Sequence, residues 1–298
     1  MKINIVSPST NSVNTKQDGA NVQGDEIIAR AWHKYLNLDK RVEEVVLNGP
    51  DSIKYDVCLS FTPLAPSTNG YKVLYLQNVF PKPAWPGTVE VYQHVKNNYN
   101  AFIFPSPGLQ KECGDGLVCQ FAVDPTIFYP SYIDNTLAKD CCFVGNNIRD
   151  RATTEKYILA ARDKGLVVYG NQAGWNDPIC VGKISLEDER VLYSSSKVCL
   201  NAHLDEHLQY GSFNFRIFNI LACKGFIISD HSEYLENEFK DCIVFTEGDS
   251  QLREQIDYYI NNLQATEKYR EAGFNKVLDK HTFKHRIEDF LLWIGDKL

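Results

Sequence analysis

No stretch of this sequence approaches the roughly 20 consecutive apolar residues that a membrane-spanning helix needs. Its start, MKINIVSP, lacks the small-residue cleavage site of a secretory signal peptide and reads better as a first strand. Basic residues (31 Lys and Arg) are outnumbered by acidic ones (38 Asp and Glu), which argues against a nucleic-acid partner. Repeats and low-complexity tracts are also missing. We therefore expect a cytoplasmic globular protein with at most peripheral membrane association.

The nine cysteines form no C-x-x-C pair, which is the spacing typical of zinc and redox sites. Most of them lie in apolar, strand-like surroundings such as Tyr55-Asp56-Val57-Cys58-Leu59. An odd number of scattered cysteines indicates buried, reduced thiols rather than disulfides or metal ligands. We expect no metal site, and this cysteine usage is typical of a cytosolic protein.

Short apolar runs alternate with amphipathic stretches along the whole chain. The runs predict strands at 2–6, 43–47, 55–60, 72–76, 101–104, 117–121, 141–144, 166–169, 197–201, 226–229 and 242–245. The amphipathic stretches predict helices at 24–37, 107–113, 151–164, 186–194, 213–224, 250–262, 266–278 and 281–295. Strands that alternate with helices favour parallel sheets and an α/β fold.

A length of 298 residues exceeds the comfortable size of one hydrophobic core. The proline-containing segment FAVDPTIFYPSYIDNTLAKD (121–140) is the predicted boundary, after which CCFVG restarts the strand pattern. We expect two Rossmann-like, doubly wound domains at 1–130 and 138–275. The remaining residues, 276–298, carry a last helix that can pack on either half, including back on the first domain. Two such domains face each other across a cleft, with ligands at the carboxyl ends of the strands.

Two polar loops follow predicted strands of the second half. In CCFVGNNIRDR (141–151), Gly145 and Asn146 suit a tight turn, and Arg149 and Arg151 bring guanidinium groups to a helix N-terminus, which suits a phosphate or diphosphate. The alternative is a capped surface turn with solvated arginines. The second loop, which contains VGKIS and Lys183, offers backbone to a flat base or simply connects a helix to a strand.

The segment SSSKVCLNAHLDEHLQYGSFNFR (194–216) places His203 at the carboxyl end of a predicted strand, where sites occur. Ser212 is the expected N-cap of helix 213–224, so the backbone amides of Phe213 and Asn214 face the same crevice. Arg216 lies in the first turn, where a cation opposes the helix dipole unless an anion is bound nearby.

Two loops of the first half carry hydrogen-bonding groups that suit a polyhydroxylated substrate. The loop after the first strand is long enough to be functional, although a plain surface loop is equally consistent with it. The second loop, LQNVFPKPAWPG (76–87), adds an aromatic plane, yet also suits a rigid proline-rich connection. The candidate residues are Asp18, Asn21, Gln23 and Asp25 in the first loop, and Gln77, Asn78 and Trp85 in the second.

Three stretches together resemble GT-B glycosyltransferases of the CgeB-like and family-1/4-like group. FAVDPTIFYP is similar to the segment that closes the first domain of these enzymes, and FVGNNIRDR to the loop that opens the donor domain. NFRIFNILACKGFIISD resembles the family's donor-site helix and the strand after it, and EGDSQLREQIDYYINN resembles the next helical segment of the pattern. The resemblance implies a glycosyltransferase that moves a sugar from a UDP-, GDP- or dTDP-linked donor to a hydroxyl of a glycan, lipid-linked glycan or protein, in glycan biosynthesis.

By the family pattern, the donor diphosphate meets the loop at 145–151 and the N-terminal turn of helix 213–224, the base lies near 182–184, and His203 lines the catalytic cleft. The expected donor-binding residues are therefore Gly145, Asn146, Arg149, Arg151, Lys183, Ser212, Phe213, Asn214, Arg216 and Asn219. With no metal, arginines and helix amides must stabilise the leaving diphosphate, and the resemblance favours retention at the anomeric carbon. An inverting enzyme needs a general base, for which Asp18, Asp25 and His203 are candidates.

One departure from the family pattern concerns two glutamates spaced eight positions apart in many relatives. Gly211 and Asn219 stand at those positions here. Asn219 offers hydrogen bonds to ribose hydroxyls but no carboxylate. Two alternatives therefore stay open: a nucleotide-sugar epimerase or hydrolase on the same fold, and a non-catalytic protein that binds a nucleotide or sugar.

Overall fold

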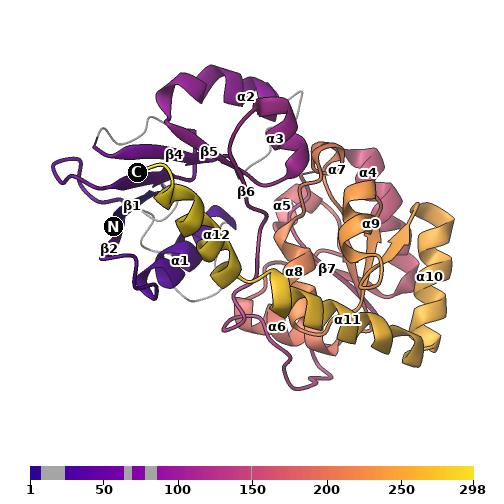
Figure 1. The fold of residues 1–298 in the computed structure, drawn as a ribbon. Coiled ribbons are helices and arrows are strands. Elements are labelled where there is room, and N and C mark those ends of the chain that lie inside the picture. The colour runs from indigo at the N-terminus through magenta and orange to yellow at the C-terminus, as the bar shows by residue number, and fades with distance from the viewer. Residues whose placement is uncertain (8–23, 64–68, 78–85, 149) are drawn as a thin grey trace.

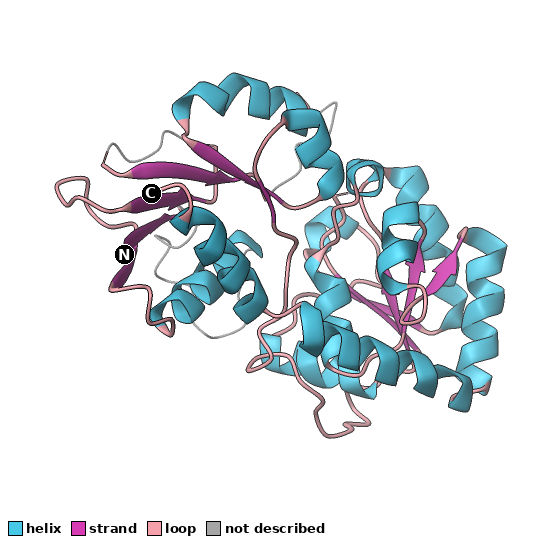
Figure 2. Ribbon diagram, viewed as in Figure 1, coloured by secondary structure: helices cyan, strands magenta, loops and turns pink. Residues whose placement is uncertain are grey.

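The computed structural model describes residues 1–7, 24–63, 69–77, 86–148 and 150–298. Two parallel β-sheets, each flanked by helices, form the two halves of the molecule (Figure 2). The first sheet has the strand order β2-β1-β3-β4-β5-β6 and the second has the order β11-β10-β9-β7-β8. Every strand pairing is parallel, as the alternation of strands and helices predicts. The predicted fold class, α/β with two Rossmann-like domains, is confirmed.

The N-terminal half contains six strands whose central members are buried on both faces, as parallel strands covered by helices must be. Its strands are β1 (Lys2–Val6), β2 (Glu44–Leu47), β3 (Val57–Ser60), β4 (Tyr71–Tyr75), β5 (Ala101–Phe104) and β6 (Leu117–Val118). Its helices are α1 (Gly24–Asn37), α2 (Thr88–Val95), the 3-10 turn η2 (Lys96–Asn98) and α3 (Pro107–Cys113).

The C-terminal half contains five strands and most of the remaining helices. Its strands are β7 (Cys141–Val144), β8 (Leu166–Tyr169), β9 (Val198–Asn201), β10 (Ile227–Asp230) and β11 (Val244–Thr246). The helical elements are α4 (Arg151–Tyr157), η3 (Leu159–Lys164), α5 (Gln172–Trp175), α6 (Leu186–Ser195), α7 (Asp205–Tyr210), α8 (Phe215–Ala222), α9 (Glu233–Phe239), α10 (Asp249–Asn261), α11 (Gln264–Lys280) and α12 (Phe283–Gly295).

The predicted strands all occur, and the differences lie among the helices. The prediction of one helix over 151–164 is wrong, because the chain forms α4 and then a 3-10 turn. Four short helices escape prediction: α2, α5, α7 and α9. The helix expected at 213–224 begins at Phe215, with Asn214 rather than Ser212 as its N-cap residue.

Two chain segments connect the halves and lie side by side. Val123, in the first crossing, exchanges backbone hydrogen bonds with His281 and Phe283 in the second. The buried Arg286 reinforces this junction by donating to the carbonyl oxygens of Gln120 and Phe121 at 2.8 and 3.0 Å. The chain therefore leaves the C-terminal half beside the point where it entered.

The last helix, α12, packs against α1 of the N-terminal half (Figure 1). The rings of Phe290 and Trp32 meet with centroids 5.1 Å apart, and Arg41 forms an ion pair with Glu288. The end of the chain is thus part of the N-terminal core.

All nine cysteines are free and buried, which confirms the prediction that they are buried. Burial raises the pKa of the Cys113 and Cys119 thiols to about 12. Within the part of the chain that the structure describes, no helix is long and apolar enough to cross a membrane.

Candidate active site

In the C-terminal half, the turns that follow β7 and β8 are joined by hydrogen bonds. The Gly145 N–H donates to the carbonyl of Tyr169 at 2.8 Å, and its own carbonyl accepts from the Trp175 indole at 2.9 Å. The exposed Asn146 accepts from the backbone of Asn171. A side chain at position 145 would lie 2.4 Å from the Arg216 guanidinium, so only glycine fits this turn.

Arg216, in the first turn of α8, connects these turns with the end of β9. Its Nε donates to the carbonyl of Val144, and its Nη1 donates to Asn201 Oδ1 at 2.9 Å. The guanidinium also lies 4.1 Å from the centre of the Phe143 ring, a favourable cation–π contact. Sequence reasoning expected this cation to need a bound anion, but protein acceptors occupy much of its donor capacity. The residue holds three segments of the site together.

His203 and Asp230 form a buried pair at the ends of the neighbouring strands β9 and β10. The His203 Nδ1 lies 2.7 Å from one carboxylate oxygen of Asp230, and the His203 backbone N–H donates to the other at 2.6 Å. The exposed fractions of both residues are 1% or less. Among the described residues, His203 Nε2 is buried without a hydrogen-bond partner. A lone pair or an N–H is therefore available at this nitrogen.

Asp230 is held as a carboxylate by these contacts. Burial by itself raises its pKa, but its interactions with His203 and its hydrogen bond from the Ser229 hydroxyl outweigh burial and bring the pKa below its ordinary value. The Ser229 hydroxyl in turn accepts from Asn201, whose side-chain oxygen receives Arg216. A continuous hydrogen-bond chain thus runs from the turn at Gly145 to His203.

The segment from Ser212 to Asn214 precedes α8, and two of its buried polar atoms have no hydrogen-bond partner among the described residues. The expected donor amides of Phe213 and Asn214 precede the helix, because Asn214 itself is the N-cap residue. Phe213 is buried against Phe239. Ser212 Oγ and Asn214 Oδ1 are buried without partners among the described residues, although Asn214 Nδ2 donates to the carbonyl of Ala202. The corrected first-turn amides are those of Phe215, Arg216 and Ile217.

The two positions that depart from the family pattern have different environments. Gly211 has φ 71°, and an added Cβ would lie 2.4 Å from the Tyr234 ring, so no larger residue fits there. Asn219 is partly buried on α8, one turn after Arg216 and therefore on the same side of the helix.

Arg151 and Lys183 are solvent-exposed at the rim of the same half. Arg151 is the first residue of α4, with 89% of its side chain exposed, and pairs with Glu155. Lys183 is exposed in the loop before α6. Both cations are therefore available to an approaching anion.

Most residues expected to contact an acceptor lie outside the described residues: Asp18, Asn21, Gln23, Asn78 and Trp85, together with the donor candidate Arg149. Asp25 is described only through its backbone in α1. Gln77 is buried and donates to the carbonyl of Phe61 at 3.2 Å, with its side-chain oxygen unpartnered among the described residues.

The site residues that sequence reasoning missed are Asn201, Ser229, Asp230, Glu189 and Glu206. The first three are polar residues that end apolar strands, in VCLN and IISD, and that position was a usable signal. Glu189, on α6, interacts with Tyr193 and Arg216, and burial raises its pKa to about 7. The charged residues around Glu189 in the sequence are typical of a surface helix, so the sequence did not indicate that this side chain is part of the site.

Short helix α7 brings the site against the N-terminal half. Glu206 accepts a hydrogen bond at 3.0 Å from the backbone N–H of Thr88, the first residue of α2. Gly108 in α3 approaches the Tyr210 backbone so closely that a Cβ would lie 2.4 Å from its carbonyl. The carboxyl ends of the C-terminal strands therefore face the partner domain.

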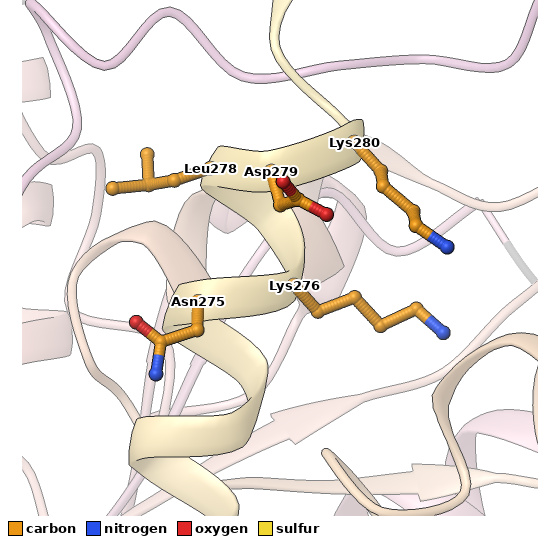
Figure 3. Close-up of a pocket in the computed structure, with 5 residues that line it drawn as sticks. All are labelled: Asn275, Lys276, Leu278, Asp279 and Lys280. Atoms are coloured by element: carbon orange, nitrogen blue, oxygen red, sulfur yellow. The ribbon is translucent and has the colours of Figure 1, made fainter.

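A surface hollow of about 650 Å³ lies elsewhere, beside α11. Figure 3 shows Lys276 and Lys280 extending to one side of this helix, and Asn275 and Leu278 to the other. A single helix lines the hollow, and none of the expected site residues does. Among the described residues, no group of three or more His, Cys, Asp or Glu side chains is placed to hold a metal ion.

Part of the chain matches a known protein family, and the whole chain matches known structures. Residues 151–292, which include α8 and the ends of β9 and β10, match the glycosyl transferase-like family model. Residues 151–292 are therefore similar to the glycosyl transferase-like family, and the whole chain has the fold of GT-B glycosyltransferases. Its fold is similar over 99% of its length to sucrose-phosphate synthase from Thermosynechococcus elongatus, with a TM-score of 0.71, 13% identity and 98% of that chain covered.

Two further solved structures share the fold of this chain. A glycosyltransferase from Rickettsia africae has a TM-score of 0.69 at 13% identity, covering 99% of this chain and 98% of the other. HepE from Anabaena, solved with UDP-glucose, has a TM-score of 0.67 at 13% identity, covering 98% and 99%. No curated protein matches the chain by sequence.

Proposed function

We propose that this protein is a glycosyltransferase, which transfers a sugar from a nucleotide-sugar donor to a hydroxyl of a glycan, lipid-linked glycan or protein. The observation that carries the proposal is the gathering of the Gly145 turn, Arg216, the α8 amides and His203 at the carboxyl ends of β7, β9 and β10. A parallel α/β sheet binds ligands at this edge, and α8 directs its N-terminal dipole to it.

In the proposed donor complex, the diphosphate lies against the Gly145–Asn146 turn and the first turn of α8. Arg151 and Lys183 approach it from the exposed rim, and Asn219 bonds the ribose hydroxyls. These positive groups and amides stabilise the charge that develops as the nucleoside diphosphate leaves. We propose that transfer needs no divalent metal and retains the anomeric configuration. Sugar release unchanged by EDTA and a product with the donor's anomeric configuration are the expected results.

UDP-glucose is the first donor to test, because HepE, which shares the fold, was solved with it. A thermal-shift screen with UDP, GDP, dTDP, CMP and ADP distinguishes the nucleotides. A ligand at about 100 times its Kd should stabilise the protein by about 2.7 kcal/mol. We expect the largest shift with UDP, and no shift with any nucleotide would contradict the proposal.

Two substitutions test the location of the donor. Arg151→Ala and Asn219→Ala should each weaken nucleotide binding, since they remove a rim cation and a ribose contact. Arg253→Ala is the control, because Arg253 is a surface arginine of the same domain that, like Arg151, forms an ion pair, here with Asp163. Unchanged nucleotide affinity in both site variants would overturn the assignment of these residues. The proposed activity would still be tested separately by the thermal-shift screen.

A further inference from the structure

The contacts of Asp230 determine which ring nitrogen of His203 carries the proton, as well as where the ring lies. Each carboxylate oxygen of Asp230 receives one donor from His203, the ring nitrogen Nδ1 at 2.7 Å and the backbone N–H at 2.6 Å. An ionised carboxylate only accepts hydrogen bonds, so the short contact to Nδ1 requires a proton on that nitrogen. The competing donor, Asn201 Nδ2, lies farther from Nδ1, at 3.4 Å.

The opposite nitrogen of the ring is left without a partner. His203 is 1% exposed, and its Nε2 is buried with no hydrogen-bond partner among the described residues. A buried polar atom of this kind is destabilising until a partner reaches it. The ring of His207 on α7 lies nearby, nearly perpendicular and 6.1 Å away between centroids, and side chains such as this one must shift for a ligand to enter.

We propose that Asp230 is a positioning residue, which holds His203 with the proton on Nδ1 so that the Nε2 lone pair accepts a hydrogen bond from a hydroxyl of the transferred sugar. The inference rests on the proposed function for the nature of the ligand. The sugar is the part of the donor beyond the diphosphate, and the chain of Arg216, Asn201, Ser229 and Asp230 connects the turn at Gly145 with this nitrogen.

Asp230→Asn provides the sharpest test, because its effect on the ring follows from the donors alone. The His203 backbone N–H always donates, so the amide oxygen of the new asparagine must face it. The amide NH₂ then faces Nδ1, which becomes an acceptor, and the ring proton moves to Nε2. The variant therefore presents an N–H where the native protein presents a lone pair.

Nitrogen-15 NMR of histidine-labelled protein reads this tautomer directly, with His203→Gln to assign the signals among the seven histidines. We expect protonated Nδ1 and bare Nε2 in the native protein, and the reverse in Asp230→Asn. Asp124→Asn is the matched control, since Asp124 is another buried, hydrogen-bonded aspartate, held by Lys34 and Tyr35. It should leave the His203 tautomer unchanged. A native ring protonated on Nε2 or on both nitrogens, or a tautomer that Asp230→Asn does not change, would overturn the positioning role.

Calorimetric titration with UDP and UDP-glucose tests the ligand. Asp230→Asn should weaken UDP-glucose binding about tenfold, since a buried hydrogen bond is lost, and should leave UDP binding unchanged. Equal losses for both ligands, or no loss for either, would reject a contact with the transferred sugar. If UDP fails to bind even the native protein, the proposed function fails, whereas the tautomer still decides the role of Asp230.

Discussion

Individual polar residues at strand ends form the candidate site, and their connections cross large sequence separations. Asn201, Ser229 and Asp230 each lie at the end of an apolar strand, which is visible in the sequence. That they bond one another and Arg216 is not visible, because it depends on β9 lying beside β10 and on the direction of α8. Arg216, which the sequence predicts to bind an anion, also donates hydrogen bonds to the ends of β7 and β9 and so holds them together.

Glu189 supplies a pH-dependent prediction at the residue scale. Burial raises the pKa of its carboxyl to about 7, against the ordinary value of 4.5, although Tyr193 and Arg216 act in the opposite direction. A folded-state pKa above the unfolded one means that the folded protein binds the proton more tightly. The stability associated with this group is present below about pH 4.5 and is lost as the pH rises through about 7.

Glu189→Gln should therefore gain stability relative to the native protein as the pH is raised from 4.5 to 7.5. Urea unfolding at several pH values measures the difference in the free energy of unfolding. Glu187→Gln, at an exposed position in the same helix, controls for the loss of one negative charge. A difference between Glu189→Gln and the native protein that does not change with pH would contradict the prediction.

Secondary-structure elements were predictable where their hydrophobic pattern was continuous or clearly periodic. The predicted strands all coincide with observed ones because buried parallel strands are short, continuous apolar runs. Helices α5 and α7, of four and six residues, offer too few turns for a periodic pattern. Helix α8 starts two residues later than expected because Asn214, rather than Ser212, takes the extended N-cap conformation. The first turn of α8, which matters most for the site, was therefore misplaced by two residues.

Gly211 tests the connection between α7 and α8. It ends α7 with φ 71°, and an added Cβ would lie 2.4 Å from the Tyr234 ring. Gly211→Ala should destabilise the protein by about 1–3 kcal/mol, because both backbone strain and a steric clash oppose it. Gly295→Ala is the matched control, since an added Cβ there would meet nothing within 4 Å. Chemical denaturation of both variants gives the comparison, and equal stabilities would refute the role of Gly211.

The whole molecule depends on a chain that crosses between its halves twice. The composition and length predicted two α/β domains, and the alternation of elements predicted their parallel sheets. The sequence left open where the last helix packs, because its apolar face is compatible with either domain. The structure places it on α1, where Phe290 is fully buried against Trp32.

This arrangement predicts that the end of the chain stabilises the N-terminal half. Phe290→Ala should lower the free energy of unfolding by about 3–5 kcal/mol, the usual cost of a large buried cavity. Leu292→Ala, on the same helix but 59% exposed, should change it by less than about 0.5 kcal/mol. Hydrogen exchange should show the loss of protection in α1 of the Phe290 variant. Protection lost only in the C-terminal half would argue against the packing.

The central claim is that the carboxyl edge of the C-terminal sheet binds a nucleotide-sugar. Calorimetric titration of the native protein with UDP-glucose tests it most directly, with Arg151→Ala titrated in parallel. We expect saturable binding at one site per chain, weakened by the substitution at the rim of that edge. Saturable binding that Arg151→Ala and Asn219→Ala both leave unchanged, or no binding of UDP-glucose or of any nucleotide in the screen by a folded protein, would contradict it.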